Sequence, residues 1–304
     1  MQLYLPIAEV SVNIFTIIGL GGLVGILSGM FGVGGGFLLT PLLIFYGIPP
    51  AVAVASQANQ IAGSSIAGAL GHARHGGLDT RMGGFLIVGG IAGAALGTYI
   101  FKWLQGLGQL DLAISLSYVV FLGGVGTLML IESSRALTSR AGKKRRRKAK
   151  PPRQRLSRRL PLQVYFPTSK LVISAVVPIG LGVAIGMLVT VMGVGGGFIL
   201  VPALIYLLGM PTQVVIGTSL MQIIFVTAAA TVLHAVTTQS VDVILALLLL
   251  VGAVFGTRFG VHVGQKLKAE QLRILLALVV LGVAVKLGID MVRPPDTLFV
   301  VEVA

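Results

Sequence analysis

The sequence predicts an all-α polytopic membrane protein built from two homologous halves. Of its 304 residues, 55% are hydrophobic and only 11% are charged, whereas soluble globular domains carry about 25% charged residues. Ten apolar segments follow one another along the chain, and a six-residue glycine motif occurs twice. This composition excludes an ordinary soluble enzyme and a disordered or fibrous chain.

The apolar segments are expected to be helices, because a segment that crosses a bilayer must satisfy its own backbone hydrogen bonds. They cover residues 11–31, 36–46, 51–71, 83–104, 111–131, 171–192, 197–208, 213–234, 241–262 and 272–289. The segments 36–46 and 197–208 are short. At about 1.5 Å per residue, each covers only about half of a bilayer core of roughly 30 Å. The sequence leaves open whether they are re-entrant half-helices or full spans.

An internal repeat divides the chain into residues 1–131 and 171–304, joined by a linker at 132–170. The motif Gly-Val-Gly-Gly-Gly-Phe stands at 32–37 and again at 193–198. Further matched pairs follow in order: Pro41 and Pro202, Pro49 and Pro211, Gln60 and Gln222, His72 and His234, Gly93 and Gly252, Gly97 and Gly256, Thr98 and Thr257. A duplicated unit of this kind is common in secondary transporters.

Positive charge is concentrated in the linker 132–170, which has fourteen Lys or Arg and one acid, a net +13 of the formal +14. The positive-inside rule predicts that this loop is cytoplasmic, and it suits contact with anionic lipid head groups. Since it lies between apolar segments rather than on a folded domain, we expect no nucleic-acid partner.

Tracing the segments from this cytoplasmic loop places both termini outside and makes the halves inverted repeats. The rival topology has eight full spans and parallel repeats. It would place Arg258, Lys266, Lys268 and Arg273 on or near the outside, against the charge rule.

The glycine motifs are the first candidates for chemistry. Adjacent glycines between two apolar segments are expected to interrupt the helix, with new helices starting near Phe37 and Phe198. Helix N-termini carry partial positive charge and bind anions. The residues concerned are Gly34, Gly35, Gly36, Gly195, Gly196 and Gly197. The alternatives are a tight turn or close helix packing.

A polar stripe in the third segment of each half is the second candidate. It comprises Ser56, Gln57 and Gln60 in the first half and Thr218, Ser219 and Gln222 in the second. Polar side chains are costly in lipid, so this face should point inward. Neutral donors suit an oxyanion, while interhelical hydrogen bonding is the structural alternative.

Acidic residues are nearly absent from the span centres, which favours an anionic or neutral substrate. His72 and His234 end equivalent helices. They suit either proton coupling or contacts to head groups and backbone. The sequence has no P-loop, HExxH or GxSxG motif, so we expect no enzyme, metal centre or cofactor. An anion channel and a membrane scaffold with a basic docking loop remain alternatives to a carrier.

The paired Gly-x-Gly-Gly-Gly-Phe motifs, each followed by Pro41 or Pro202, and the long basic loop between homologous halves resemble the TauE/SafE family of sulfite exporters and anion permeases. The resemblance covers about residues 11–290. It implies an integral inner-membrane transporter for sulfur-containing oxyanions such as sulfite, sulfoacetate or related organosulfonates. On this basis we expect alternating access to a small anion, and a homo-oligomer is consistent with the expectation.

Overall fold

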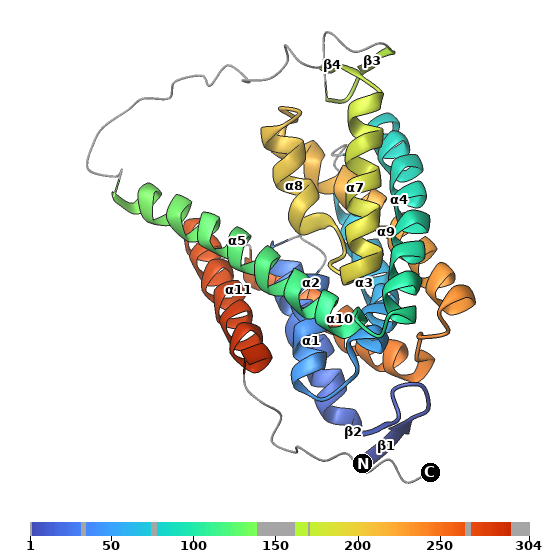
Figure 1. The fold of residues 1–304 in the computed structure, drawn as a ribbon. Coiled ribbons are helices and arrows are strands. Elements are labelled where there is room, and N and C mark those ends of the chain that lie inside the picture. The colour runs from blue at the N-terminus through green and yellow to red at the C-terminus, as the bar shows by residue number, and fades with distance from the viewer. Residues whose placement is uncertain are drawn as a thin grey trace.

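The computed structural model describes residues 2–31, 35–73, 78–138, 162–169, 171–264 and 269–292. Within these ranges the chain is almost entirely helical, with two short β-hairpins (Figure 1). The first half contains β1 (Gln2–Leu5), β2 (Val10–Asn13), α1 (Ile14–Phe31), α2 (Gly36–Phe45), α3 (Pro50–Ala73), α4 (Thr80–Gly106) and α5 (Leu110–Thr138). The second contains β3 (Gln163–Phe166), β4 (Leu171–Ser174), α7 (Val176–Met192), α8 (Gly197–Tyr206), α9 (Thr212–Thr237), α10 (Val243–Gly264) and α11 (Ala269–Val292).

The ten expected helical segments are confirmed, and the protein is an all-α polytopic membrane protein. By length and composition, five of the described helices can cross a bilayer: α4, α5, α9, α10 and α11. Their outward faces are apolar: Leu128, Val120 and Phe255 are 67%, 67% and 71% exposed. A surface of this kind suits lipid rather than water.

The hairpins differ from expectation. Hydrophobicity predicts helix at residues 11–13 and 171–174, but these residues belong to strands β2 and β4, which pair with β1 and β3. Alternating β-branched residues such as Val10 and Val12 favour extended chain, and a short apolar run does not distinguish a strand from a helix. The predicted linker 132–170 also contains the end of α5 and the strand β3.

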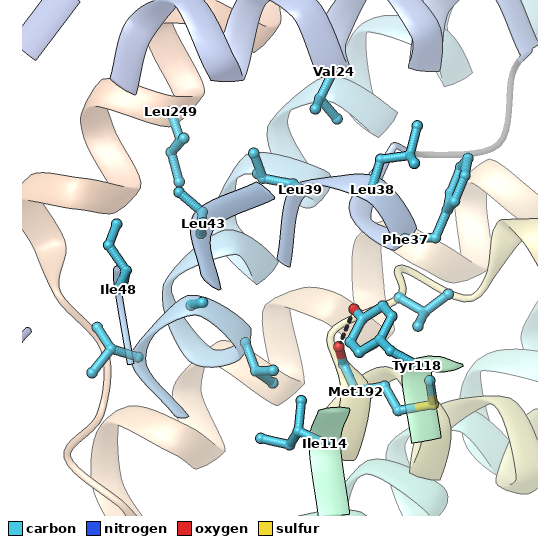
Figure 2. Packing of buried hydrophobic residues seen from close by; sticks show 14 of the residues in the cluster. Val24, Phe37, Leu38, Leu39, Leu43, Ile48, Ile114, Tyr118, Met192 and Leu249 are labelled. Carbon is cyan, nitrogen blue, oxygen red and sulfur yellow. Dashed lines mark hydrogen bonds between the residues drawn. The ribbon is translucent and has the colours of Figure 1, made fainter. Parts of the chain in front are cut away.

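The two halves interlock instead of packing as separate domains. α1 packs along α10, and their equivalents α7 and α4 pack along each other in the same way. α3 packs against α9, and α5 against α11. Each hydrophobic core therefore combines helices from both halves, as in the cluster around Leu43, Met192 and Leu249 (Figure 2).

Equivalent hairpins lie at opposite ends of the molecule (Figure 1). β1–β2 lies at the end where α1 begins, and β3–β4 lies at the end where α7 begins. The first helices of the two halves consequently run in opposite directions. The architecture agrees with the inverted arrangement that the charge distribution predicts.

Glycines allow the paired helices to approach closely. The position that a Cβ on Gly21 would occupy lies 2.6 Å from the carbonyl oxygen of Leu249, and that on Gly25 lies 2.6 Å from the oxygen of Ala253. On the other helix pair, a Cβ on Gly182 would lie 2.5 Å from the oxygen of Leu86. Only a residue without a Cβ fits at such contacts, which are frequent between membrane helices.

Candidate functional site: two broken helices and an axial glutamine pair

The two glycine motifs interrupt the helices where the sequence indicates. Gly35 precedes α2 with φ 61°, and Gly196 precedes α8 with φ 73°. These left-handed conformations favour glycine. Gly193 ends α7 in the same conformation, with φ 70°. Gly34 lies outside the described residues.

The starts of α2 and α8 meet inside the protein. Phe37 and Phe198 stack with ring centroids 4.5 Å apart and planes inclined by 16°. Because these are equivalent residues of the two halves, their contact lies on the axis that relates the halves. A Cβ on Gly36 would lie 2.8 Å from the carbonyl oxygen of Gly193, so the motifs themselves touch. Each ten-residue helix thus directs its N-terminus, with its free N–H groups and partial positive charge, into the interior.

Gln60 on α3 and Gln222 on α9 are equivalent residues of the two halves whose side-chain amides are wholly unsatisfied. Both side chains are fully buried, and neither the oxygen nor the nitrogen of either amide has a hydrogen-bond partner among the residues that the structure describes. Buried polar groups are nearly always hydrogen-bonded, and leaving one unpaired costs about 1–3 kcal/mol. Two equivalent exceptions in an inward-facing pair of helices indicate groups available to a ligand.

Gln222 lies between the α8 break and α4. Its Oε1 is 4.0 Å from the position of a Cβ on Gly196, and its Nε2 is 3.1 Å from that on Gly90. A Cβ on Gly90 would press on the amide nitrogen, whereas a Cβ on Gly196 would contact the amide oxygen at ordinary van der Waals distance. Gly90 and the glycine motif therefore both border the unsatisfied amide of Gln222. Gly195 and Gly197 are buried in the same segment.

Ser56 and Thr218, by contrast, have structural partners. The backbone N–H of Asp242 donates to Ser56 Oγ at 2.8 Å, and the N–H of Asp79 donates to Thr218 Oγ1 at 3.0 Å. Ser219 donates to the carbonyl of Ile216 in its own helix at 2.9 Å. These hydroxyls form the interhelical and local hydrogen bonds that the structural alternative describes, and the binding role predicted for them stays a prediction.

The sequence reading missed the two buried aspartates. Asp79 caps α4, where its Oδ1 accepts from the N–H of Met82 at 3.0 Å. Asp242 caps α10, where its Oδ1 accepts from the N–H groups of Ile244 and Leu245 at 3.1 Å each. Both are almost fully buried. An Asp directly before an apolar helix at matching places in both halves was the available signal.

Gln57 belongs to an asymmetric cluster at the end of α7. Its Nε2 donates to the carbonyl oxygen of Gly193 at 2.5 Å, and Tyr118 Oη donates to that of Met192 at 2.5 Å. Figure 2 shows Tyr118 reaching Met192 from α5, on the other half of the chain. The cluster is fully buried, as is Thr40 beside it. Gln57 thus stabilises the broken helix directly.

His234 is buried rather than interfacial, with 1% of its surface exposed. Its Nε2 donates to the carbonyl of Thr190 at 3.0 Å, its Nδ1 lies 3.2 Å from Thr238 Oγ1, and its ring meets Phe101 edge-on at 4.6 Å. Of the alternatives that the sequence left open, the structure shows a backbone partner for His234, and proton coupling stays a prediction. His72 is in α3, and its side chain lies outside the described part of the chain.

Comparison with known proteins assigns this architecture to a class of membrane transporters. The family model described as "Sulfite exporter TauE/SafE" matches residues 17–287. The chain therefore belongs to the TauE/SafE sulfite exporter family, and it is a membrane transporter.

Relatives from Bacillus subtilis and Xylella fastidiosa match over nearly their whole length. The probable membrane transporter protein YjnA of Bacillus subtilis (strain 168) is 29% identical over 90% of this chain and 98% of its own. A probable membrane transporter protein of Xylella fastidiosa (strain Temecula1 / ATCC 700964) is 30% identical over 90% of this chain and 94% of its own. No solved structure matches the chain.

Proposed function

We propose that this protein is a secondary transporter that moves a small sulfur oxyanion, sulfite or an organosulfonate, across the inner membrane by alternating access. The observation that carries the proposal is the pair of fully buried, unpartnered amides of Gln60 and Gln222. They lie on α3 and α9, equivalent helices that pack against each other between the two halves, and transporters with inverted repeats bind their substrates at the interface of the repeats. The family assignment supports the oxyanion class.

The chemistry of the site suits an oxyanion. The N-termini of α2 and α8 supply two partial positive charges and backbone N–H donors. The Nε2 groups of Gln60 and Gln222 add neutral donors that can replace the water around the anion. Without a full positive charge, the site holds the anion weakly enough to release it on the other side. No cofactor is needed for this step.

The interlocked halves supply the moving parts. Helices α1 and α10 form one close pair and α4 and α7 form another, and each pair contains one helix from each half. In our proposal, these pairs rock about the axial helices α3 and α9, so that the site opens first to one side and then to the other. The basic loop at 132–170 then lies in the cytoplasm, where it contacts anionic lipids.

The test is labelled sulfite flux in proteoliposomes, with and without a pH gradient. We expect saturable flux in the wild type and a loss of about tenfold or more in Gln60→Ala and Gln222→Ala, since each removes donors to the anion. Gln60→Leu distinguishes a site defect from misfolding. Because it replaces an unpartnered buried amide by an apolar group of similar size, it should abolish flux while raising thermal stability.

Unchanged flux in the folded alanine variants would contradict the assigned site. Absence of sulfite flux in folded wild-type protein would redirect the substrate search to sulfoacetate and other organic anions. Unitary current steps would favour the channel alternative over a carrier.

A further inference from the structure

A polar cluster lies at the C-terminal end of α7, whereas the proposed anion site lies at the N-terminal ends of α2 and α8. We propose that Thr40, Gln57 and Tyr118, together with the carbonyl oxygens of Met192 and Gly193, form a binding site for Na⁺, the coupling ion of this transporter. The coupling role rests on the proposed function, whereas the binding of Na⁺ does not depend on the identity of the anion.

The first argument is the helix polarity. α7 ends at Met192, and the last carbonyls of a helix lack partners within it and carry partial negative charge. An anion is repelled from such an end, and a cation is attracted to it. Broken transporter helices use their C-terminal ends and unwound carbonyls to coordinate Na⁺ or H⁺.

The second argument is an excess of oxygen acceptors. Within the described ranges of the chain, Gln57 Oε1 and Thr40 Oγ1 are buried without a hydrogen-bond partner. Thr40 Oγ1 lies 3.2 Å from the position of a Cβ on Gly193, so it faces the carbonyl end of α7. Each carbonyl here already accepts one hydrogen bond and keeps a second lone pair. Carbonyl, amide and hydroxyl oxygens are the ligands that a hard cation prefers.

The third argument comes from the repeat, which serves as an internal control. When the two halves are aligned on their matched pairs, Thr40 corresponds to Val201, Gln57 to Ser219 and Tyr118 to Ala277. Ala277 is fully buried, and Ser219 bonds within its own helix. The fold therefore forms without this polar set in the second half. The features that the fold requires, such as Asp79 and Asp242, occur in both halves. This asymmetric set instead suits a function performed once per molecule.

The position of the cluster explains coupling. Gly36, at the start of α2, lies against the Gly193 carbonyl, so Na⁺ at the end of α7 would lie close to an anion at the start of α2. The attraction between Na⁺ and the anion is strong in a site without water. Each ion should increase the affinity for the other by the same factor, as thermodynamic linkage requires.

The experiment measures binding of ²²Na⁺ to the purified, full-length protein without any anionic substrate. Thermal unfolding in sodium chloride is compared with unfolding in choline chloride at equal ionic strength. We expect saturable binding and a higher Tm in sodium. Thr40→Val copies the residue of the second half and should weaken Na⁺ binding by about tenfold or more. Tyr118→Phe should weaken it as well.

The matched control is Thr227→Val. Thr227 is a fully buried threonine, but its hydroxyl donates to the Ile223 carbonyl of its own helix at 2.7 Å. This variant should bind Na⁺ within about twofold of the wild type. Thr40→Val should stay folded in choline, because it removes an unpartnered hydroxyl, so that misfolding does not explain its loss of binding.

Two binding results would overturn the inference: no Na⁺ binding by the folded wild type, or equal Na⁺ binding by Thr40→Val and the wild type. Sulfite flux that is driven by a pH gradient and indifferent to Na⁺ would overturn it too, while leaving the proposed anion transport intact. Na⁺ binding without sulfite flux would support the cation site and would contradict only the choice of sulfite as the transported anion.

Discussion

Asp79 and Asp242 occupy equivalent positions in the two halves, and each accepts hydrogen bonds from the β-hairpin of the other half. Asp79 Oδ2 accepts from both the N–H and the Oγ of Ser169 in the β3–β4 turn, at 3.1 and 2.5 Å. Asp242 Oδ2 accepts from the N–H of Ile7 in the β1–β2 turn at 3.2 Å. The same aspartates cap α4 and α10, so one carboxylate joins a helix start to the opposite repeat at each end of the molecule.

Asp79→Ala should reduce the free energy of unfolding by about 3 kcal/mol, because it leaves the buried donors of Met82 and Ser169 without an acceptor. The measurement is the Tm of the detergent-solubilised protein. Asp290→Ala is the control, since Asp290 is exposed near the end of α11 and its loss should leave the Tm nearly unchanged. Equal Tm values for the two variants would show that the hairpin contact contributes little.

Gly21→Ala should destabilise the protein and lower its yield in the membrane. The added Cβ would lie 2.6 Å from the backbone oxygen of Leu249, which forces α1 and α10 apart. Gly19→Ala is the matched substitution two residues earlier in the same helix, where nothing lies within 4 Å of the Cβ position. It should be neutral or stabilising by up to about 1 kcal/mol. Similar Tm values for both variants would contradict the close packing of these helices.

The inverted arrangement predicts opposite accessibility for the two hairpins. The chain has no cysteine, so one introduced thiol gives an unambiguous signal. Tyr4 in β1 and Tyr165 in β3 are 59% and 54% exposed. A membrane-impermeant maleimide applied to intact cells should label Tyr4→Cys, and it should label Tyr165→Cys only after permeabilisation. Labelling of both variants from the same side would support parallel repeats instead.

His234→Gln should retain anion flux and its pH profile within about twofold, because the glutamine amide can still donate to the Thr190 carbonyl without titrating. His234→Leu should lower the Tm, since it leaves that buried carbonyl without its donor. Flux in proteoliposomes across a pH series provides the measurement. A pH dependence that disappears in His234→Gln would establish this histidine as a proton-coupling group.

The local sequence determined most of the helical architecture. Apolar length located all ten helices that the structure describes, because a lipid-facing helix must be apolar over its whole exposed face. The glycine triplets located both helix breaks, since residues such as Gly35 and Gly196 adopt a backbone conformation that disfavours other residues. The repeat and the basic loop predicted an inverted pair of halves. Hydrophobicity does not predict the two hairpins, because short apolar strands and helices have the same composition.

The partners of each polar side chain were decided only by the tertiary structure. Ser56, Gln57 and Gln60 follow one another on a single helix and looked equivalent in the sequence. Yet Ser56 accepts a hydrogen bond from the N–H of Asp242, and Gln57 donates one to the Gly193 carbonyl. The Gln60 side chain has no hydrogen-bond partner among the described residues. The physical reason is that hydrophobicity and helix-breaking are local properties of the chain, whereas a hydrogen bond depends on which distant segment, more than a hundred residues away, is packed against that face.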